Sequence, residues 1–279
     1  MKIIVHFGFP KTGSSTLQFG LFKPLSEDGQ LLLSTWRLND ENESHDRRPS
    51  SQLFCRKPIL DEYLNFDDEK LNILSDESFT APIKLRVNNF GHDIEDPINF
   101  PKLIKKQLID KFGHDIEIQA FITIRNQSKQ IYSQYVEEYN LKRYKNVDLV
   151  FDEQGNVDLN GFDIYKYDEY INTLNSVFSE ENVSVLFFEE WKNNFDEFTL
   201  KLSEIFDIEH EIVKKQLTNN HVNQKPKKDG GYFTKDGKDF IPYFSNEDMN
   251  KIKDYFYEDN LKLQERFNGK YDLKELGYL

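Results

Sequence analysis

Short apolar runs alternate with longer amphipathic stretches along most of this chain. The short runs are rich in β-branched and aromatic residues, which is typical of buried strands. The longer stretches repeat apolar side chains at helical spacing, and one of them ends at Gly113, a common helix stop. We expect strands at residues 3–7, 31–33, 71–74, 117–124 and 183–188, and helices at residues 101–112, 126–143, 162–178, 194–206 and 245–267.

The order of these elements predicts an α/β fold. Parallel strands need crossover connections, usually helices, and those helices cover both faces of the sheet. We therefore expect three layers, with a central, mostly parallel sheet flanked by helices. A chain of 279 residues with 38% hydrophobic content can bury one large core, so we expect a single domain over residues 1–279.

Two polar stretches interrupt this pattern. Residues 36–58 are expected to form a surface insertion, because they carry too few apolar side chains to bury a core. Residues 218–237, which include Lys227 and Lys228, are expected to form a long loop. The tail to Leu279 carries aromatic and leucine side chains and is expected to dock on the core.

The first strand runs into a glycine-containing loop and then a helix. Gly8 and Gly13 keep the glycine spacing of the phosphate loop G-x-x-x-x-G-K-[ST]. A strand, a glycine loop and a helix in this order aim backbone N–H groups at an anion. Ser14 stands where that motif has lysine, and the lysine lies inside the loop, at Lys11. A lysine at this position suits the end group of a shorter 5′-anion. The alternative interpretation of this stretch is an ordinary strand-to-helix turn that binds no ligand.

A second candidate anion site follows the strand that ends at residue 124. Arg125 comes directly after that strand, and Ser133 lies eight positions later on the next helix. Arginine offers a permanently charged, bidentate fork for a phosphate, and a hydroxyl two turns along the helix can add a donor. Taken separately, Arg125 also fits a strand-end salt bridge and Ser133 a solvated helix position. The combination with the first loop favours one shared site.

Composition narrows the function classes. The formal net charge of −13 argues against broad binding of nucleic acid or anionic membranes, so an anion site must be locally positive. No apolar run reaches the length of a membrane span, and the first residues lack a signal-peptide pattern. The single cysteine, Cys55, excludes an intramolecular disulfide framework and is expected to be a small packing residue. We expect a cytoplasmic protein.

The two motifs resemble those of a known family. Residues 10–16, with the sequence PKTGSST, resemble the 5′-phosphosulfate loop of sulfotransferases that use 3′-phosphoadenosine 5′-phosphosulfate (PAPS), and Arg125 with Ser133 resembles their 3′-phosphate site. The resemblance implies a P-loop-like sulfotransferase architecture. It also implies sulfuryl transfer from PAPS to an acceptor hydroxyl or amine, with adenosine 3′,5′-bisphosphate as product. It assigns cofactor-binding roles to Lys11, Thr12, Gly13, Ser14, Ser15, Thr16, Arg125 and Ser133.

Three later features bear on this resemblance. Gln127 stands where the family usually has proline, which would stiffen the turn after Arg125. Lys227 and Lys228 fit the late basic loop that the family often closes over the 3′-phosphate, and a solvated lysine cluster is the alternative. Residues 189–191 resemble a family landmark and are interpreted as structural, with an aromatic side chain packed on the sheet.

The implied chemistry requires two kinds of group. Lys11 and the loop N–H groups would stabilise the charge on the leaving 5′-phosphate, and a general base would take the acceptor's proton. Glu77, at the tip of the strand over residues 71–74, is the first choice for the base, and His45 is the second. The scheme needs no metal, and the sequence shows no metal-ligand cluster. The expected acceptor is a carbohydrate, with a small alcohol as the alternative.

Two other function classes stay open. A P-loop kinase or nucleotide hydrolase would share the first loop, but the displaced lysine and the lack of a clear magnesium-binding acid count against it. A non-catalytic binding protein could retain the same fold without turnover. The presence of Lys11, Arg125 and Ser133 argues against that alternative.

Overall fold

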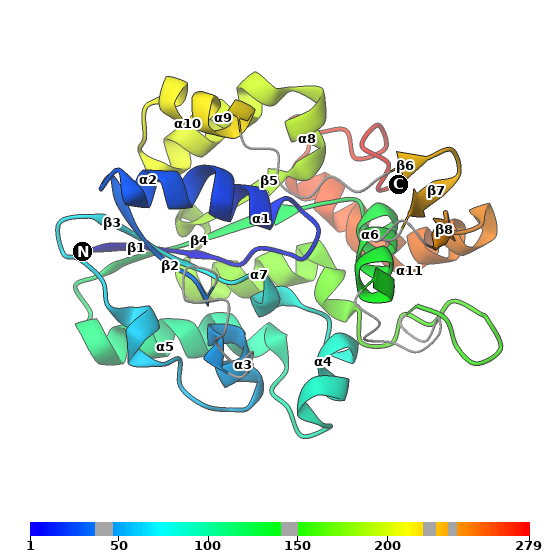
Figure 1. Cartoon of the computed structure of the whole chain (residues 1–279), viewed down its shortest axis with the longest axis horizontal. Coiled ribbons are helices and arrows are strands. Elements are labelled where there is room, and N and C mark those ends of the chain that lie inside the picture. Colours follow the sequence, from blue (N-terminus) through cyan, green and yellow to red (C-terminus); the bar gives the residue numbers. More distant parts are fainter. Residues whose placement is uncertain (37–46, 141–149, 220–226, 234–238) are drawn as a thin grey trace.

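A five-stranded parallel sheet forms the centre of the protein (Figure 1). The computed structural model describes residues 1–36, 47–140, 150–219, 227–233 and 239–279. The strands lie in the order β2-β3-β1-β4-β5, and every neighbouring pair is parallel. They are β1 (Lys2–His6), β2 (Leu31–Ser34), β3 (Leu71–Ser75), β4 (Glu117–Ile124) and β5 (Val183–Phe187).

The register of the sheet brings three chain segments to one edge. His6 at the end of β1 is paired with Ser75 of β3 and with Phe121 of β4. The chain therefore leaves β1, β3 and β4 at the same edge, where open α/β sheets bind their ligands. The loop after β1, the tip after β3 and the turn after β4 meet there because of strand order alone.

Helices cover both faces of the sheet, so the architecture has three layers (Figure 1). One face carries α1 (Ser14–Thr16), α2 (Lys23–Glu27), α9 (Phe195–Phe206) and α10 (His210–Asn219), with a π-helical segment, Leu17–Phe22, between the first two. The other face carries α5 (Phe100–Phe112) and α7 (Tyr167–Phe178). The remaining helices are α3 (Pro49–Phe54), α4 (Lys84–Phe90), α6 (Gln127–Asn140), α8 (Phe188–Asn193) and α11 (Asn246–Arg266).

The central strand contributes to two buried cores. Ile4 packs in the cluster that includes side chains of α2 and α9, whereas Ile3 and Val5 pack in the cluster that includes α5 and α7. Successive side chains of a strand point to opposite faces, so a strand covered on both sides must be apolar throughout. This requirement explains the continuous apolar run at the start of the sequence.

The predicted α/β architecture is confirmed, with local differences. The predicted helix over residues 162–178 begins as a 3-10 turn, Asp163–Tyr165, and α7 starts at Tyr167. The predicted helix over residues 126–143 is α6, and its last three predicted residues lie outside the described part of the chain. The helices α3, α4 and α10 are not among the predicted elements.

Part of the predicted surface insertion is buried instead. The α3 helix within residues 36–58 places Leu53 and Phe54 in the core, and the Phe54 ring packs edge-on against Phe100 with 4.8 Å between centroids. Two apolar side chains on one short helix are enough to anchor an otherwise polar stretch. Cys55, expected as a packing residue, follows the end of this helix and is exposed.

The predicted loop over residues 218–237 contains regular structure. The α10 helix extends to Asn219, and β6 (Lys227–Lys228) and β7 (Gly231–Phe233) form an antiparallel pair. A third strand, β8 (Phe240–Pro242), completes this small sheet. The Tyr132 hydroxyl of α6 donates to the Ile241 carbonyl at 2.9 Å, which attaches the small sheet to α6. Short strand pairs of this kind lack the long alternating pattern from which strands are predicted.

The C-terminal tail docks on the core, as expected from its leucine and aromatic side chains. Leu273 and Tyr278 are buried. The preceding helix, α11, packs against α6 and α7 and begins at the predicted cap Ser245, whose hydroxyl accepts the Asp248 N–H at 3.1 Å. Within the described ranges, no helix combines the length and the apolar character that crossing a bilayer demands.

His6 is a buried histidine held beneath the glycine loop. Its Nδ1 lies 2.8 Å from the Ser75 hydroxyl oxygen, and its ring stacks on Phe121 with 5.1 Å between centroids. Burial lowers the pKa of His6 to about 3, and the charge of Glu77 opposes only part of this effect. The ring is therefore neutral in the folded protein at any pH near neutrality.

The burial of His6 predicts that the folded protein loses stability as the pH falls. Between about pH 6.5 and pH 3 the unfolded chain binds a proton on His6 that the folded chain excludes. The free energy of unfolding should fall as pH falls through this window, by up to about 1.4 kcal/mol per pH unit from this residue. Urea unfolding at pH 7, 6 and 5 should show a shallower decline for His6→Asn than for the wild type. Equal declines would show that folding does not lower the pKa of His6.

Candidate functional site

The loop after β1 has an unusual backbone that its own hydrogen bonds hold in place. Lys11 has φ of 68° and Gly13 has φ of 89°, so both lie in the left-handed region. The Thr12 hydroxyl donates to the Phe9 carbonyl at 2.7 Å, and the amide of Leu17 donates to the Gly13 carbonyl at 3.0 Å. A left-handed backbone at lysine costs roughly 1–3 kcal/mol, and such strain concentrates at functional sites.

Both glycines of the loop are required by close neighbours. A Cβ at Gly13 would lie 3.0 Å from the Phe188 ring of α8, in addition to the strain of its positive φ. A Cβ at Gly8 would lie 2.9 Å from the His6 ring and 2.9 Å from Ser14 Cβ. The loop is therefore closely packed from below by β1 and from the side by α8.

Arg125 joins the two sequence motifs. Its Nη1 donates to the Lys11 carbonyl at 2.9 Å, across 114 positions of sequence. The guanidinium also lies over the Phe188 ring, 5.0 Å from its centroid. Burial lowers the pKa of Arg125, and the charge of Glu189 partly opposes this, but an arginine remains charged at neutral pH. A positive charge on a half-buried side chain is thus held beside the loop.

Helix α6 begins two residues after Arg125 and runs past the loop. Lys11 Nζ lies 3.5 Å from Oε2 of Glu137, so this face of α6 is turned toward the loop. Ser133 precedes Glu137 by four positions and therefore shares its face. The structure thus places Lys11 and Arg125 in contact and puts the half-buried Ser133 on the face of α6 that bears Glu137. The roles of these residues in binding stay predictions.

The tip after β3 also contacts the loop. The Ser14 hydroxyl donates to Glu77 Oε2 at 2.7 Å, so the expected general base lies beside the loop. Asp76 accepts the amide of Ser78 at 2.9 Å and caps the 3-10 turn that carries Glu77. The other expected base, His45, lies outside the described residues.

The other residues expected to bind the cofactor differ in position and in burial. The Thr12 hydroxyl is used inside the loop, and Thr16 is buried one turn into the helix. Ser15 is half-buried at the start of that helix. The backbone of Lys227 pairs with Tyr232 of β7, and the Tyr232 ring lies 5.9 Å from the Tyr132 ring of α6, centroid to centroid. The small sheet therefore packs against α6.

Two residues of the site, Phe188 and Glu137, have no role in the sequence prediction, and a third, Glu189, was expected to be only structural. Phe188 packs against both Gly13 and Arg125, and Glu137 pairs with Lys11. Glu189 accepts the Asn126 amide at 3.0 Å, which fixes the backbone next to Arg125. The resemblance of residues 189–191 to a family landmark pointed to this segment, whereas nothing in the local sequence singled out Glu137.

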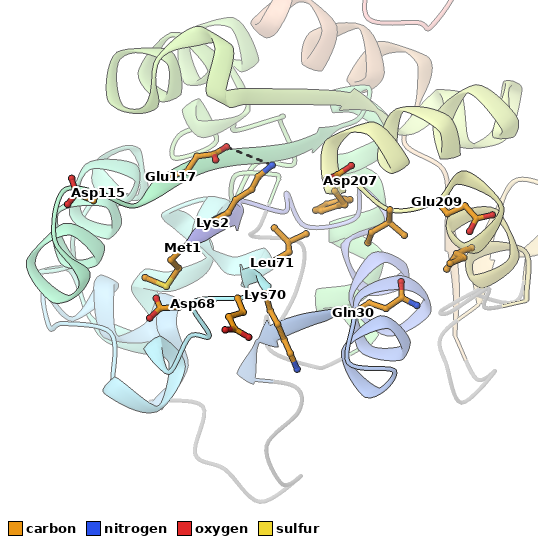
Figure 2. A pocket seen from close by; sticks show the side chains of 14 residues that line it. Met1, Lys2, Gln30, Asp68, Lys70, Leu71, Asp115, Glu117, Asp207 and Glu209 are labelled. Atoms are coloured by element: carbon orange, nitrogen blue, oxygen red, sulfur yellow. Dashed lines mark ion pairs between the residues drawn. The ribbon is translucent and has the colours of Figure 1, made fainter.

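The opposite edge of the sheet has a different character. A cavity of about 680 Å³ opens beside the amino ends of β1 and β3 (Figure 2). Its charged lining consists of Asp68, Glu69, Asp115, Glu117, Asp207 and Glu209 with Lys2 and Lys70. Lys2 and Glu117 form an ion pair, drawn as a dashed line in Figure 2, with 3.8 Å between Nζ and Oε1. This excess of carboxylates repels a polyanion, so the cavity does not suit a nucleotide sulfate.

Among the residues that the structure describes, no group of three or more His, Cys, Asp or Glu side chains is arranged to hold a metal ion. The loop with Lys11 and the turn with Arg125 each present a positive charge that can bind an anionic group.

Glu137 should compete with a bound anion for the Lys11 ammonium. An anion that binds Lys11 must share it with the Glu137 carboxylate, so Glu137→Gln should tighten binding of adenosine 3′,5′-bisphosphate by about fivefold, or ~1 kcal/mol. Titration calorimetry measures the change. Glu180→Gln, which removes an exposed carboxylate before β5, is the control for net charge and should have little effect. Weaker binding in Glu137→Gln would mean that the carboxylate supports the ligand.

Sulfotransferase structures are similar to this chain. A sulfotransferase from Alicyclobacillus acidocaldarius matches it with a TM-score of 0.56 and 14% identity, over 98% of this chain and 97% of that chain. Mouse sulfotransferase SULT7A1 complexed with PAP matches with a TM-score of 0.44 and 12% identity, over 99% and 87%. No protein-family model and no curated protein matches the sequence. The first likeness shows the fold: the chain has the architecture of a sulfotransferase, as the resemblance implied.

Proposed function

We propose that this protein is a PAPS-dependent sulfotransferase that moves a sulfuryl group to an acceptor hydroxyl or amine. One observation carries the proposal: Arg125 Nη1 donates to the carbonyl of Lys11. This bond joins the two motifs that resemble the 5′-phosphosulfate loop and the 3′-phosphate site. The similarity of the fold to that of the Alicyclobacillus sulfotransferase supports the same function.

The residues present suit such a donor. The guanidinium has five N–H donors, of which the Lys11 carbonyl takes one, and its partial burial strengthens contacts with a phosphate. Ser133 lies on the helix face directed to the same region. The loop supplies the Lys11 ammonium and the amides at the start of the helix that begins at Ser14. PAPS would be held through its 3′-phosphate by Arg125 and Ser133, and through its 5′ end by the loop.

The donor would supply an activated sulfuryl group, and the chain would manage charge and a proton. Lys11 is placed to stabilise the negative charge that develops on the leaving 5′-phosphate. Glu77 is our first choice for the base that accepts the acceptor's proton, because its carboxylate lies within hydrogen-bond distance of the loop. Glu137, beside Lys11, is a second carboxylate in reach of the same region.

We also propose a carbohydrate as acceptor, on the strength of the family resemblance alone. Trp36 and Tyr135 carry rings on which a sugar could stack, but both rings have protein neighbours. Arg48 lies over the Trp36 ring at 3.4 Å from its centroid, and Tyr135 packs against Phe151 and Phe244. A panel of glycans and small alcohols with labelled PAPS identifies the acceptor. We also propose that the enzyme is cytoplasmic and has a single domain.

Donor binding can be tested without knowing the acceptor. Adenosine 3′,5′-bisphosphate at about 100 times its Kd should raise Tm by about 5 °C or more without added metal, because a ligand that binds only the folded state stabilises it. ATP with magnesium should give a much smaller shift. A shift with ATP and magnesium alone would identify the protein as a kinase or nucleotide hydrolase instead.

Two substitutions separate turnover from donor binding. Lys11→Ala should reduce kcat by about 10²-fold or more, because it removes a preorganised charge at the leaving group. Arg125→Ala should mainly weaken bisphosphate binding, by about 2–5 kcal/mol, because a buried charge contact is lost. Steady-state kinetics and calorimetry measure the two effects. Near-normal turnover in Lys11→Ala, or normal affinity in Arg125→Ala, would remove that residue from its proposed role.

A further inference from the structure

Residues near the C-terminus hold the turn that carries Arg125. Gln127, the first residue of α6, forms a reciprocal amide pair with Asn260 of α11. Gln127 Nε2 donates to Asn260 Oδ1 at 2.8 Å, and Asn260 Nδ2 donates to Gln127 Oε1 at 3.3 Å. Both side chains are buried, with 2% and 1% of their surface exposed. A buried, reciprocal pair of this kind fixes both partners, because any movement leaves polar groups unpaired.

The tail adds a second hold on the same turn. Asn126 Nδ2 donates to the Gly277 carbonyl, while Asn126 Oδ1 accepts the amide of Lys129 at 3.1 Å and so caps α6. The Tyr278 hydroxyl donates to Oε2 of Glu189 at 3.2 Å, and Oε1 of the same carboxylate accepts the Asn126 amide. Asn126 and Gln127 are thus hydrogen-bonded to residues that lie 151 and 133 positions later in the sequence.

Asn260, Gly277 and Tyr278 form one unit, which we name the C-terminal clamp. Asn260 Nδ2 donates to the Tyr278 carbonyl at 3.0 Å, so the helix and the tail are bonded to each other as well as to the turn. The Tyr278 ring is buried against Phe187 of β5, with 5.8 Å between centroids. The clamp is therefore anchored in the core and does not depend on solvent-exposed contacts.

The turn after β4 must hold the Arg125 guanidinium in one orientation. The Arg125 guanidinium must bond the strained Lys11 carbonyl and, in the proposed function, a phosphate of the donor. A proline at the first helical position would stiffen such a turn by fixing its φ near −65°. This chain has Gln127 there, whose backbone is intrinsically freer, and whose side chain makes the bonds described above.

We propose that the C-terminal clamp orients Arg125 for donor binding, through side-chain bonds that replace the backbone stiffness of proline at position 127. The clamp residues act on the donor only through Arg125, so they are positioning residues. The proposal rests on the proposed function. Its physical basis is preorganisation: an arginine already held in its bound orientation loses less freedom when the phosphate binds.

Two substitutions at one position test the proposal. Gln127→Ala and Gln127→Pro both delete the amide pair with Asn260, but only proline restores stiffness to the backbone. Calorimetry with adenosine 3′,5′-bisphosphate should show about tenfold weaker binding for Gln127→Ala, and binding within about twofold of the wild type for Gln127→Pro. A merely structural role of the amide pair would weaken both variants equally, and that result would overturn the proposal, as would unchanged affinity in Gln127→Ala.

A substitution in the tail gives an independent measurement. Tyr278→Phe removes the hydroxyl bonded to Glu189 and keeps the buried ring, so the donor KM should rise several-fold while kcat changes little. Tyr257→Phe, on an exposed part of α11, is the matched control and should leave both constants unchanged. An unchanged KM in Tyr278→Phe, or a loss confined to kcat, would contradict the clamp. A wild-type protein that fails to bind the bisphosphate would instead refute the proposed function on which the clamp depends.

Discussion

The hydrogen bond from Arg125 to the Lys11 carbonyl is the interaction on which the site depends. It crosses from the end of β4 to the loop after β1, two strands that are neighbours in the sheet. The bond joins two groups that are costly to hold, because Lys11 has a left-handed backbone and the half-buried guanidinium is partly desolvated. The hydrogen bond offsets part of the desolvation cost, since the charged donor and the carbonyl of the strained residue satisfy each other.

An acidic protein can build a cationic site only by separating its charges. With a formal net charge of −13, the chain has many carboxylates to keep away from a polyanion. It gathers several of them around the cavity at the amino ends of the strands, at the opposite edge of the sheet. The carboxylates at the loop edge are partnered: Glu77 by Ser14, Glu137 by Lys11 and Glu189 by Asn126 and Tyr278.

Local patterns in the sequence were sufficient for the sheet and most of its helices. Apolar runs report buried strands, and glycine with a following serine reports a loop that opens a helix, because both signals come from neighbouring residues. The errors had one cause. Residues 49–54 and 227–233 were assigned to surface or loop because they are short and polar on average, yet Leu53 and Phe54 of α3 are buried, and the small sheet attaches to α6 through Tyr132. Packing against distant elements decides such cases.

The sequence by itself determined which residue types stand at the ends of the strands: Lys11 and Gly13 after the first, Glu77 after the third, and Arg125 after the fourth. Parallel strand order then brings those ends together, so their proximity follows from the fold class. Only the tertiary structure decided the pairing of Lys11 with Glu137 and of Gln127 with Asn260. The second pair spans 133 positions, and such contacts are set by how helices pack, which leaves no periodic or local signature in the chain.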